Sequence, residues 1–137
     1  MTYITETSVL AAEAVVVETQ QPRLEVRSLS TSFATDQGRI QSVSDVSFRI
    51  LPGQTLALVG ESGSGKSVTS LSLMGLHAKT SHAQVQGEAL FVQRDGRTVD
   101  LLKIDPAALR GLRGNEMAMV FQEPMTSLNP VFTVGEQ

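Results

Sequence analysis

Apolar and polar residues alternate in two segments near the start of the chain. Leu24, Val26 and Leu29 open the first segment, and Val43–Ile50 (VSDVSFRI) repeats the pattern before a turn at residues 51–53 (LPG). A two-residue period puts every second side chain on the same face of a β-strand. The pattern therefore predicts two strands, each with one buried and one exposed face.

Two short runs are apolar almost throughout, and they are Thr55–Val59 (TLALV) and Met117–Phe121 (MAMVF). Runs of this length without alternation are typical of central strands that are covered on both faces, as in a parallel sheet. Strand-like pieces at Ala89–Val92 and Thr98–Leu102 flank the turn-forming residues 94–96 (RDG). They predict a hairpin that is appended to the main sheet.

The same pattern predicts two helices. Lys66–Leu76 has apolar residues near helical spacing and ends at a glycine. Asp105 and Pro106 supply an N-cap and a first-turn proline for a shorter helix, which Gly111 or Gly114 is expected to close.

The pattern divides the chain into two parts. Residues 1–22 are polar and acidic at both ends, which predicts a flexible extension. Residues 23–137 are predicted to form one α/β unit. Thr133–Glu136 has the spacing of a capping box that announces a further helix, so we expect the domain to be incomplete at its C-terminal end.

Composition narrows the function classes. With 41% hydrophobic and 18% charged residues, a chain of 137 residues can form one globular domain. The net charge of −3 gives no basic footprint for nucleic acid, and Arg110 and Arg113 are expected to lie on a solvated face. The chain has no cysteine for a disulfide or a thiolate metal site, and no run approaches the ~20 apolar residues of a spanning helix. At a membrane, another polypeptide would have to do the spanning.

Residues 60–67 (GESGSGKS) match the phosphate-binding pattern G-x-x-x-x-G-K-[ST] between an apolar run and a predicted helix. Backbone amides can wrap a polyphosphate only where no side chain blocks them, which explains the three glycines. We expect Lys66 to bridge the β- and γ-phosphate oxygens and Ser67 to ligate Mg²⁺. The predicted nucleotide-binding residues of this segment are Gly60, Glu61, Ser62, Gly63, Ser64, Gly65, Lys66, Ser67 and Val68.

A second motif occupies residues 119–130 (MVFQEPMTSLNP). A predicted strand ends there in Gln122, and a loop bounded by Pro124 and Pro130 follows. A polar side chain on a movable loop at the sheet edge where phosphates bind is what a switch element needs. The alternative is that Gln122 is an ordinary strand-end residue.

Together the two motifs resemble the ATP-binding cassette family over residues 23–137. The resemblance implies a P-loop NTPase fold, with a mixed sheet and an N-terminal antiparallel β-subdomain. The strings VGESGSGKS and FQEPMTSLNPVFTVGEQ are similar to the subfamily that imports oligopeptides, dipeptides, nickel and glutathione. Within it, residues 114–137 are most similar to bacterial glutathione import ATP-binding proteins.

The resemblance also implies residue roles. Gln122 corresponds to a glutamine that contacts Mg²⁺ and the attacking water and connects the site to a transmembrane partner, so Lys66 and Gln122 are the predicted catalytic residues. Phe33 falls where the family places an aromatic ring that stacks on adenine, and its alternative is a core residue of the first hairpin. The signature LSGGQ, the Walker B carboxylates and the switch histidine have no counterpart. His77 and His82 match nothing and are expected at the surface.

The function that follows from the resemblance is an ATP-hydrolysing subunit, using ATP and Mg²⁺, that energises import of glutathione or a related peptide. Dipeptide, oligopeptide or nickel import are alternatives. We expect it at the cytoplasmic face of the bacterial inner membrane, with transmembrane permease subunits, a second nucleotide-binding domain and, indirectly, a periplasmic solute-binding protein as partners. The 137-residue chain alone is expected to be inactive.

Two other classes of protein compete with this interpretation. One is a truncated, non-catalytic nucleotide-binding remnant. The other is a P-loop small-molecule kinase or GTPase, which predicts a motif for an acceptor or for guanine after the loop. No such motif is visible in the sequence.

Overall fold

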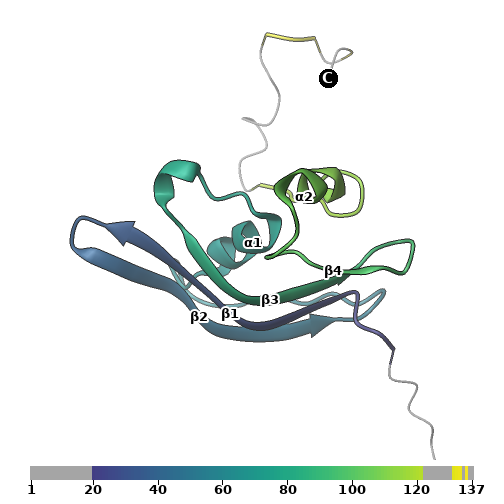
Figure 1. Cartoon of the computed structure of the whole chain (residues 1–137), viewed down its shortest axis with the longest axis horizontal. Helices are drawn as coiled ribbons and strands as arrows, with labels where there is room; N and C mark the ends of the chain where they lie inside the picture. The colour runs from purple at the N-terminus through teal and green to yellow at the C-terminus, as the bar shows by residue number, and fades with distance from the viewer. Residues whose placement is uncertain (1–19, 122–130, 134, 136–137) are drawn as a thin grey trace, which may run out of the picture.

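One antiparallel sheet organises the chain. The computed structural model describes residues 20–121, 131–133 and 135. Four strands pair in the order β2-β1-β3-β4, so that β1 is central and β2 is an edge (Figure 1). Their bounds are Leu24–Thr35 for β1, Gly38–Ile50 for β2, Gln84–Val92 for β3 and Thr98–Asp100 for β4.

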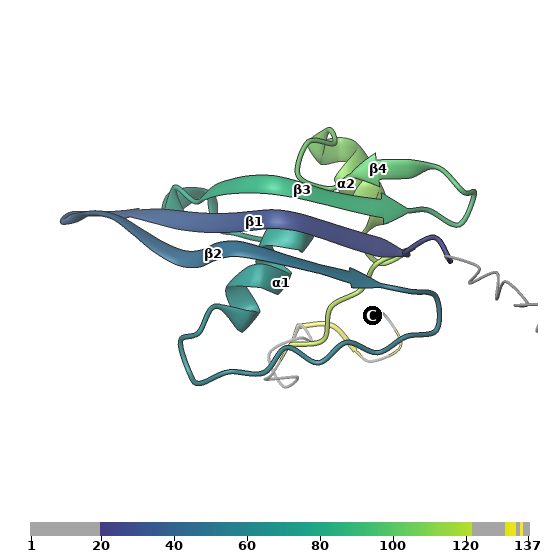
Figure 2. The ribbon, with the colours of Figure 1, turned by 90° about the horizontal axis from the view of Figure 1, so that it is seen from below.

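Two helices lie on the same side of this sheet (Figure 1). Helix α1 spans Lys66–Met74 and crosses β1 and β2 (Figure 2), and helix α2 spans Pro106–Leu112. A 3₁₀ turn, Lys79–Ser81, precedes β3. Both helices and both hairpins predicted from the sequence are confirmed, although the β3–β4 hairpin is part of the main sheet because β3 pairs with β1.

The β1–β2 hairpin is bent by irregular pairing near its middle. Ser28 and Asp45 have positive φ angles of 49° and 50° there. Each displaced amide finds a serine hydroxyl on the opposite strand: Ser28 N donates to Ser47 Oγ at 2.8 Å, and Asp45 N donates to Ser30 Oγ at 3.0 Å. The bend therefore leaves no orphaned amide at these two positions, which a β-bulge would otherwise expose.

The core lies between the sheet and the two helices. It takes the inward side chains of the strands and one apolar edge of each helix, because alternating strands and amphipathic helices have only one face to bury. Its buried members are Val26, Leu29, Val43, Leu73, Ala89, Phe91, Leu101, Leu109 and Leu112.

Both helices have defined ends. Asp105 caps α2, accepting hydrogen bonds from the amides of Ala107 at 2.8 Å and Ala108 at 3.4 Å, as the sequence predicts. The helix ends at Leu112, so neither Gly111 nor Gly114 closes it directly. The C-cap of α1 is the glycine expected there, in the left-handed conformation.

Arg113 does not lie on a solvated face as the sequence suggested. Its Nε donates to the carbonyl of Met74 at 2.7 Å, and its second guanidinium nitrogen donates to the carbonyl of Gly75 at 2.8 Å. These carbonyls are at the C-terminal end of α1, where a cation interacts favourably with the helix dipole. Arg113 therefore joins the end of α2 to the end of α1, while Arg110 is exposed.

Two of the strand predictions are wrong. Thr55–Val59 and Met117–Phe121 form no ladder with any strand among the described residues, apart from one isolated bridge between Arg113 and Met117. Val59 and Val120 are each 92% exposed. Their apolar composition fits strands covered on both faces, but a parallel strand depends on neighbours contributed from distant sequence. Among the residues that the structure describes, the parallel part of the expected mixed sheet is therefore not formed.

Other predictions concern residues outside the described part of the chain. The extension 1–22 is described only from Gln20 onward, and the helix announced at Thr133–Glu136 is described at only two of its positions. Both stay predictions.

Replacing Arg113 with Ala should lower the free energy of unfolding by about 1–2 kcal/mol, because two helix-end carbonyls lose a charged donor at a partly exposed site. Urea unfolding measures the change. Arg110→Ala is the matched control and should change stability by less than about 0.5 kcal/mol, as exposed substitutions do. Equal effects of the two substitutions would show that Arg113 does not stabilise the helix end.

Candidate functional site

The glycine-rich segment forms a turn between an extended chain and a helix. Residues 51–65 lead from β2 back along the hairpin (Figure 2) and enter α1 at Lys66. The sequence predicts this order of loop and helix, although the preceding run is not a strand.

Gly65 brings the start of α1 into contact with β2. Its φ is +88°, and a Cβ atom there would lie 2.5 Å from the carbonyl oxygen of Ser42 and 3.2 Å from Val43 Cγ2. Gly63 also has a positive φ, +80°, but a Cβ atom on it would meet nothing within 4 Å. Both positions favour glycine for their backbone conformation, and Gly65 also needs it for space.

The Lys66 ammonium donates hydrogen bonds to the loop that precedes it. Its Nζ donates to the carbonyl of Gly60 at 2.7 Å, to the carbonyl of Glu61 at 2.6 Å and to Ser64 Oγ at 3.1 Å. An ammonium has three donors, so these bonds use all of them. A phosphate oxygen can bind Lys66 by replacing one of these neutral acceptors with a charged one.

The N-terminus of α1 is left open for an anion. Its N-cap is Gly65, which offers no side chain, and the first turn carries no acidic residue. The free amides and the positive end of the helix dipole are therefore not compensated by the chain itself. They face a cavity of about 270 Å³, which is lined by Ser42, Ser62, Gly63, Ser64, Gly65, Lys66, Ser67 and Val68.

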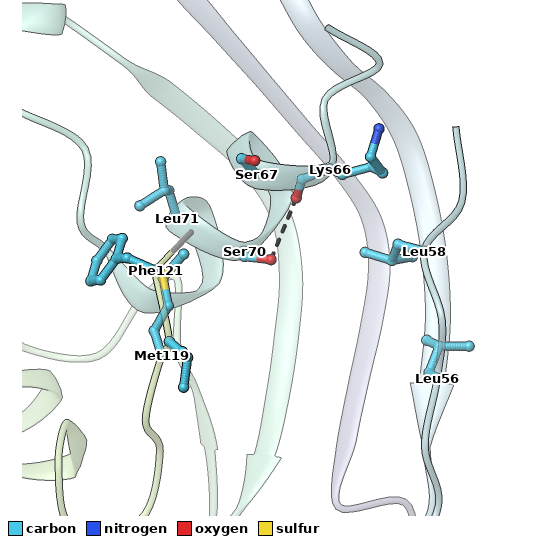
Figure 3. Close-up of a pocket in the computed structure, with 9 residues that line it drawn as sticks. Leu56, Leu58, Lys66, Ser67, Ser70, Leu71, Met119 and Phe121 are labelled. Atoms are coloured by element: carbon cyan, nitrogen blue, oxygen red, sulfur yellow. Dashed lines mark hydrogen bonds between the residues drawn. The ribbon is translucent and has the colours of Figure 1, made fainter. Parts of the chain in front are cut away.

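A second cavity, of about 570 Å³, also has Lys66 and Ser67 in its lining (Figure 3). Leu56 and Leu58 line it on one side of α1, and Met119 and Phe121 line it on the other side. Ser67 is exposed and borders both cavities. Its hydroxyl is thus accessible to a cation that accompanies an anion in the loop, since Mg²⁺ prefers oxygen ligands.

Phe33 lies on β1, apart from the loop. It lines neither cavity at the loop, and it belongs neither to the buried core nor to the residues packed against that core. Its ring meets the imidazole of His77 edge to face, with centroids 5.3 Å apart and an interplanar angle of 81°. The alternative interpretation of Phe33 as a core residue therefore loses support, and its stacking on adenine stays a prediction.

His77 is more than the plain surface residue that the sequence suggested. It is half-buried, its Nε2 lies 2.8 Å from Ser72 Oγ, and burial lowers the pKa of its imidazole. His82, in contrast, is exposed.

The structure brings together the predicted nucleotide-binding residues of the loop, but it does not bring all of the predicted site residues together. Residues 62–68 line one cavity, Gly60 and Glu61 join it through Lys66, and Phe33 lies apart. Gln122 lies outside the described residues. The sequence analysis did not identify Ser42. Its backbone carbonyl contacts Gly65, and a backbone contact of this kind does not depend on the residue type. Among described residues, no cluster of three or more His, Cys, Asp or Glu could hold a metal.

Comparison with known proteins agrees with the geometry of the loop. Residues 43–137 match the family described as ABC transporter. The chain belongs to this family. Membership identifies the glycine-rich loop as part of an ABC-type P-loop NTPase domain, and the antiparallel sheet as its β-subdomain.

Relatives of this ABC chain carry import names. A Brucella ovis protein named as a peptide import ATP-binding protein is 52% identical over 118 residues, which are 86% of this chain and 35% of the relative. Glutathione import ATP-binding proteins of Pectobacterium atrosepticum and Escherichia coli are 53% and 52% identical, over 83% of this chain and 18% of the relatives. The chain thus spans about a third of the length of the first relative and less of the others.

Replacing Gly65 with Ala should destabilise the ABC chain more than replacing Gly63 with Ala. Both substitutions place a Cβ atom at positive φ, which costs about 1–2 kcal/mol. Gly65→Ala adds the clash with the Ser42 carbonyl, worth about 1–3 kcal/mol more if the helix must shift. Urea unfolding of the two variants gives the difference, and equal losses would contradict the close approach of loop and β2.

Proposed function

We propose that this chain is the nucleotide-binding part of an ATP-hydrolysing subunit that energises import of a short peptide, with glutathione as the first candidate. The observation that carries the proposal is the loop itself: an uncapped helix N-terminus and the Lys66 ammonium meet at a cavity whose walls are mainly backbone and small side chains. The printed names of the relatives, which concern peptide and glutathione import, supply the solute class.

Each residue has a definite part in binding ATP. The amides of residues 62–67 and the dipole of α1 hold the β- and γ-phosphates. Lys66 moves one of its hydrogen bonds from a loop carbonyl to a phosphate oxygen, and the charge-assisted bond it gains is the stronger one. The Ser67 hydroxyl and the amide oxygen of Gln122 would hold Mg²⁺, which neutralises charge on the β- and γ-oxygens when bound.

Turnover and transport involve partners. The chain spans about a third of the length of the first relative, and we infer that catalysis is completed by a longer chain and by a second nucleotide-binding domain, which would supply the Walker B carboxylates and the LSGGQ signature that residues 1–137 do not contain. Transmembrane permease subunits would carry the solute and couple to the segment around Gln122. No helix in the described part of the chain is long and apolar enough to cross a membrane. From the import names of the relatives, we propose that the subunit lies at the cytoplasmic face of the inner membrane.

Replacing Lys66 with Ala in a chain that carries the complete cassette should weaken ATP binding and abolish hydrolysis, because the γ-phosphate loses its charged donor. Calorimetric titration and phosphate release measure the two effects. Lys79→Ala is the matched control, since Lys79 is exposed on the 3₁₀ turn and should change neither quantity. Normal hydrolysis by the Lys66 variant would rule out the phosphate-loop assignment.

Replacing Gln122 with Ala in the reconstituted importer should lower solute-stimulated hydrolysis far more than ATP affinity. Most binding free energy comes from the loop amides and Lys66, whereas Gln122 is expected to act on the attacking water. Parallel measurement of the ATP dissociation constant and the transport rate tests this, with the exposed turn residue Gln37→Ala as control. Equal losses would make Gln122 a simple ligand, and no loss would make it an ordinary strand-end residue.

A further inference from the structure

A chain of three polar side chains connects the central strand to the segment after α1. Thr31 Oγ1 lies 2.8 Å from Ser72 Oγ, and Ser72 Oγ lies 2.8 Å from His77 Nε2. Thr31 and Ser72 are buried, with exposed fractions of 0% and 3%. Buried polar groups of this kind hold their partners in one geometry, because a misplaced partner would leave an unsatisfied donor or acceptor.

The number of available protons decides which atoms donate in this series of hydrogen bonds. The Ser72 hydroxyl has one hydrogen, which it donates to the carbonyl of Val68 at 2.7 Å. Ser72 Oγ must then accept from both Thr31 and His77, so the proton of the neutral imidazole is on Nε2. Burial lowers the pKa of His77, which keeps the ring neutral near pH 7. The hydrogen bond thus fixes both the tautomer and the orientation of the imidazole.

The anchored imidazole contacts Phe33. The two rings meet edge to face at 5.3 Å, an arrangement that favours one relative orientation of the rings. The neighbours of Phe33 toward the hairpin turn are exposed: its cross-strand partner Ile40 is 57% exposed, and Ala34 and Thr35 are exposed as well. Without His77, the Phe33 ring would have more rotational freedom.

Phe33 is also within reach of a nucleotide in the loop. It pairs with Ile40, while the Ser42 carbonyl beside Gly65 lies two residues along β2. At ~3.3 Å per residue and ~4.8 Å between strands, the backbones of Phe33 and Ser42 lie within about 10 Å of each other. Phe33 contacts His77, which is tied to α1, so its ring lies on the same side of the hairpin as α1 and the loop.

We propose that His77 is a positioning residue for adenine: anchored on Ser72 of α1, it holds the Phe33 ring in the orientation in which the ring stacks on the base. This inference rests on the proposed function, in which the loop binds the phosphates of ATP. It adds a residue whose effect depends on the nucleobase and not on the phosphates. The ordering of Phe33 before binding lowers the entropy loss that stacking would otherwise incur.

The test compares a ligand with a base and a ligand without one, in a chain that carries the complete cassette. Affinities for ADP and for inorganic tripolyphosphate are measured for His77→Gln, Phe33→Ala, the double variant and His82→Ala. The glutamine keeps an N–H donor for Ser72 but has no ring, so it protects folding while removing the contact with Phe33. Exposed His82 is the matched control, and melting temperatures report on folding.

We expect His77→Gln to weaken ADP binding about two- to tenfold, the size of one aromatic contact, with tripolyphosphate affinity unchanged. In the Phe33→Ala background it should have no further effect, because the two residues act as one unit. An unchanged ADP affinity, an equal loss for both ligands, or an additive loss in the double variant would overturn the proposal.

The proposed function has its own control in the same assay. Lys66→Ala should weaken both ADP and tripolyphosphate, and failure of that result would reject phosphate binding by the loop. If Lys66→Ala behaves as expected but Phe33→Ala leaves ADP affinity unchanged, the phosphate site stands and the role of His77 is rejected.

Discussion

Backbone contact between the start of α1 and β2 is the constraint on which the site depends. Gly65 lies so close to the Ser42 carbonyl that no side chain fits between them, and its positive φ turns the chain from loop into helix there. The helix therefore begins against the sheet with its amides directed into the loop. Lys66, the first helical residue, reaches back to the loop carbonyls. The geometry of the proposed phosphate site is a consequence of this packing.

The face of α1 that meets the sheet is polar as well as apolar. Thr69 and Ser72 are buried, and each hydroxyl bonds to a carbonyl one turn earlier, Thr69 to Gly65 at 3.0 Å and Ser72 to Val68 at 2.7 Å. Such short side chains let the helix backbone approach the strands closely. The hydrogen bond between Ser72 and Thr31 fixes the position of α1 along β1. The sheet, which carries Phe33, and the helix, which carries Lys66, therefore keep a fixed relative position.

The sequence predicted those parts whose partners are near in sequence. The alternation around Leu24 and Val43, the RDG turn, the Asp105 cap and the glycine-lysine loop all describe local structure, and the structure contains each of them. The sequence could not show that Arg113 bonds to the end of α1 or that His77 contacts Ser72 and Phe33. A single arginine or histidine has no periodicity, and its partner depends on tertiary packing.

The two mispredicted strands failed for a related physical reason. The runs ending at Val59 and at Phe121 have the composition of doubly covered strands, and composition reports how much burial a segment favours but not which neighbour provides it. An antiparallel hairpin brings its own partner across a short turn. A parallel pair needs a strand from far away in the sequence. Tertiary pairing, absent for these runs among the described residues, overrides their strand propensity.

The loop keeps its shape although the apolar run before it makes no ladder. Its geometry comes from Gly65 against β2 and from the three bonds of Lys66, which are contacts within residues 42–66. Phosphate binding can therefore arise from local structure. In the proposed function, phosphate binding thus rests on contacts within residues 42–66, and it does not depend on the runs ending at Val59 and Phe121, which have no strand partner among the described residues.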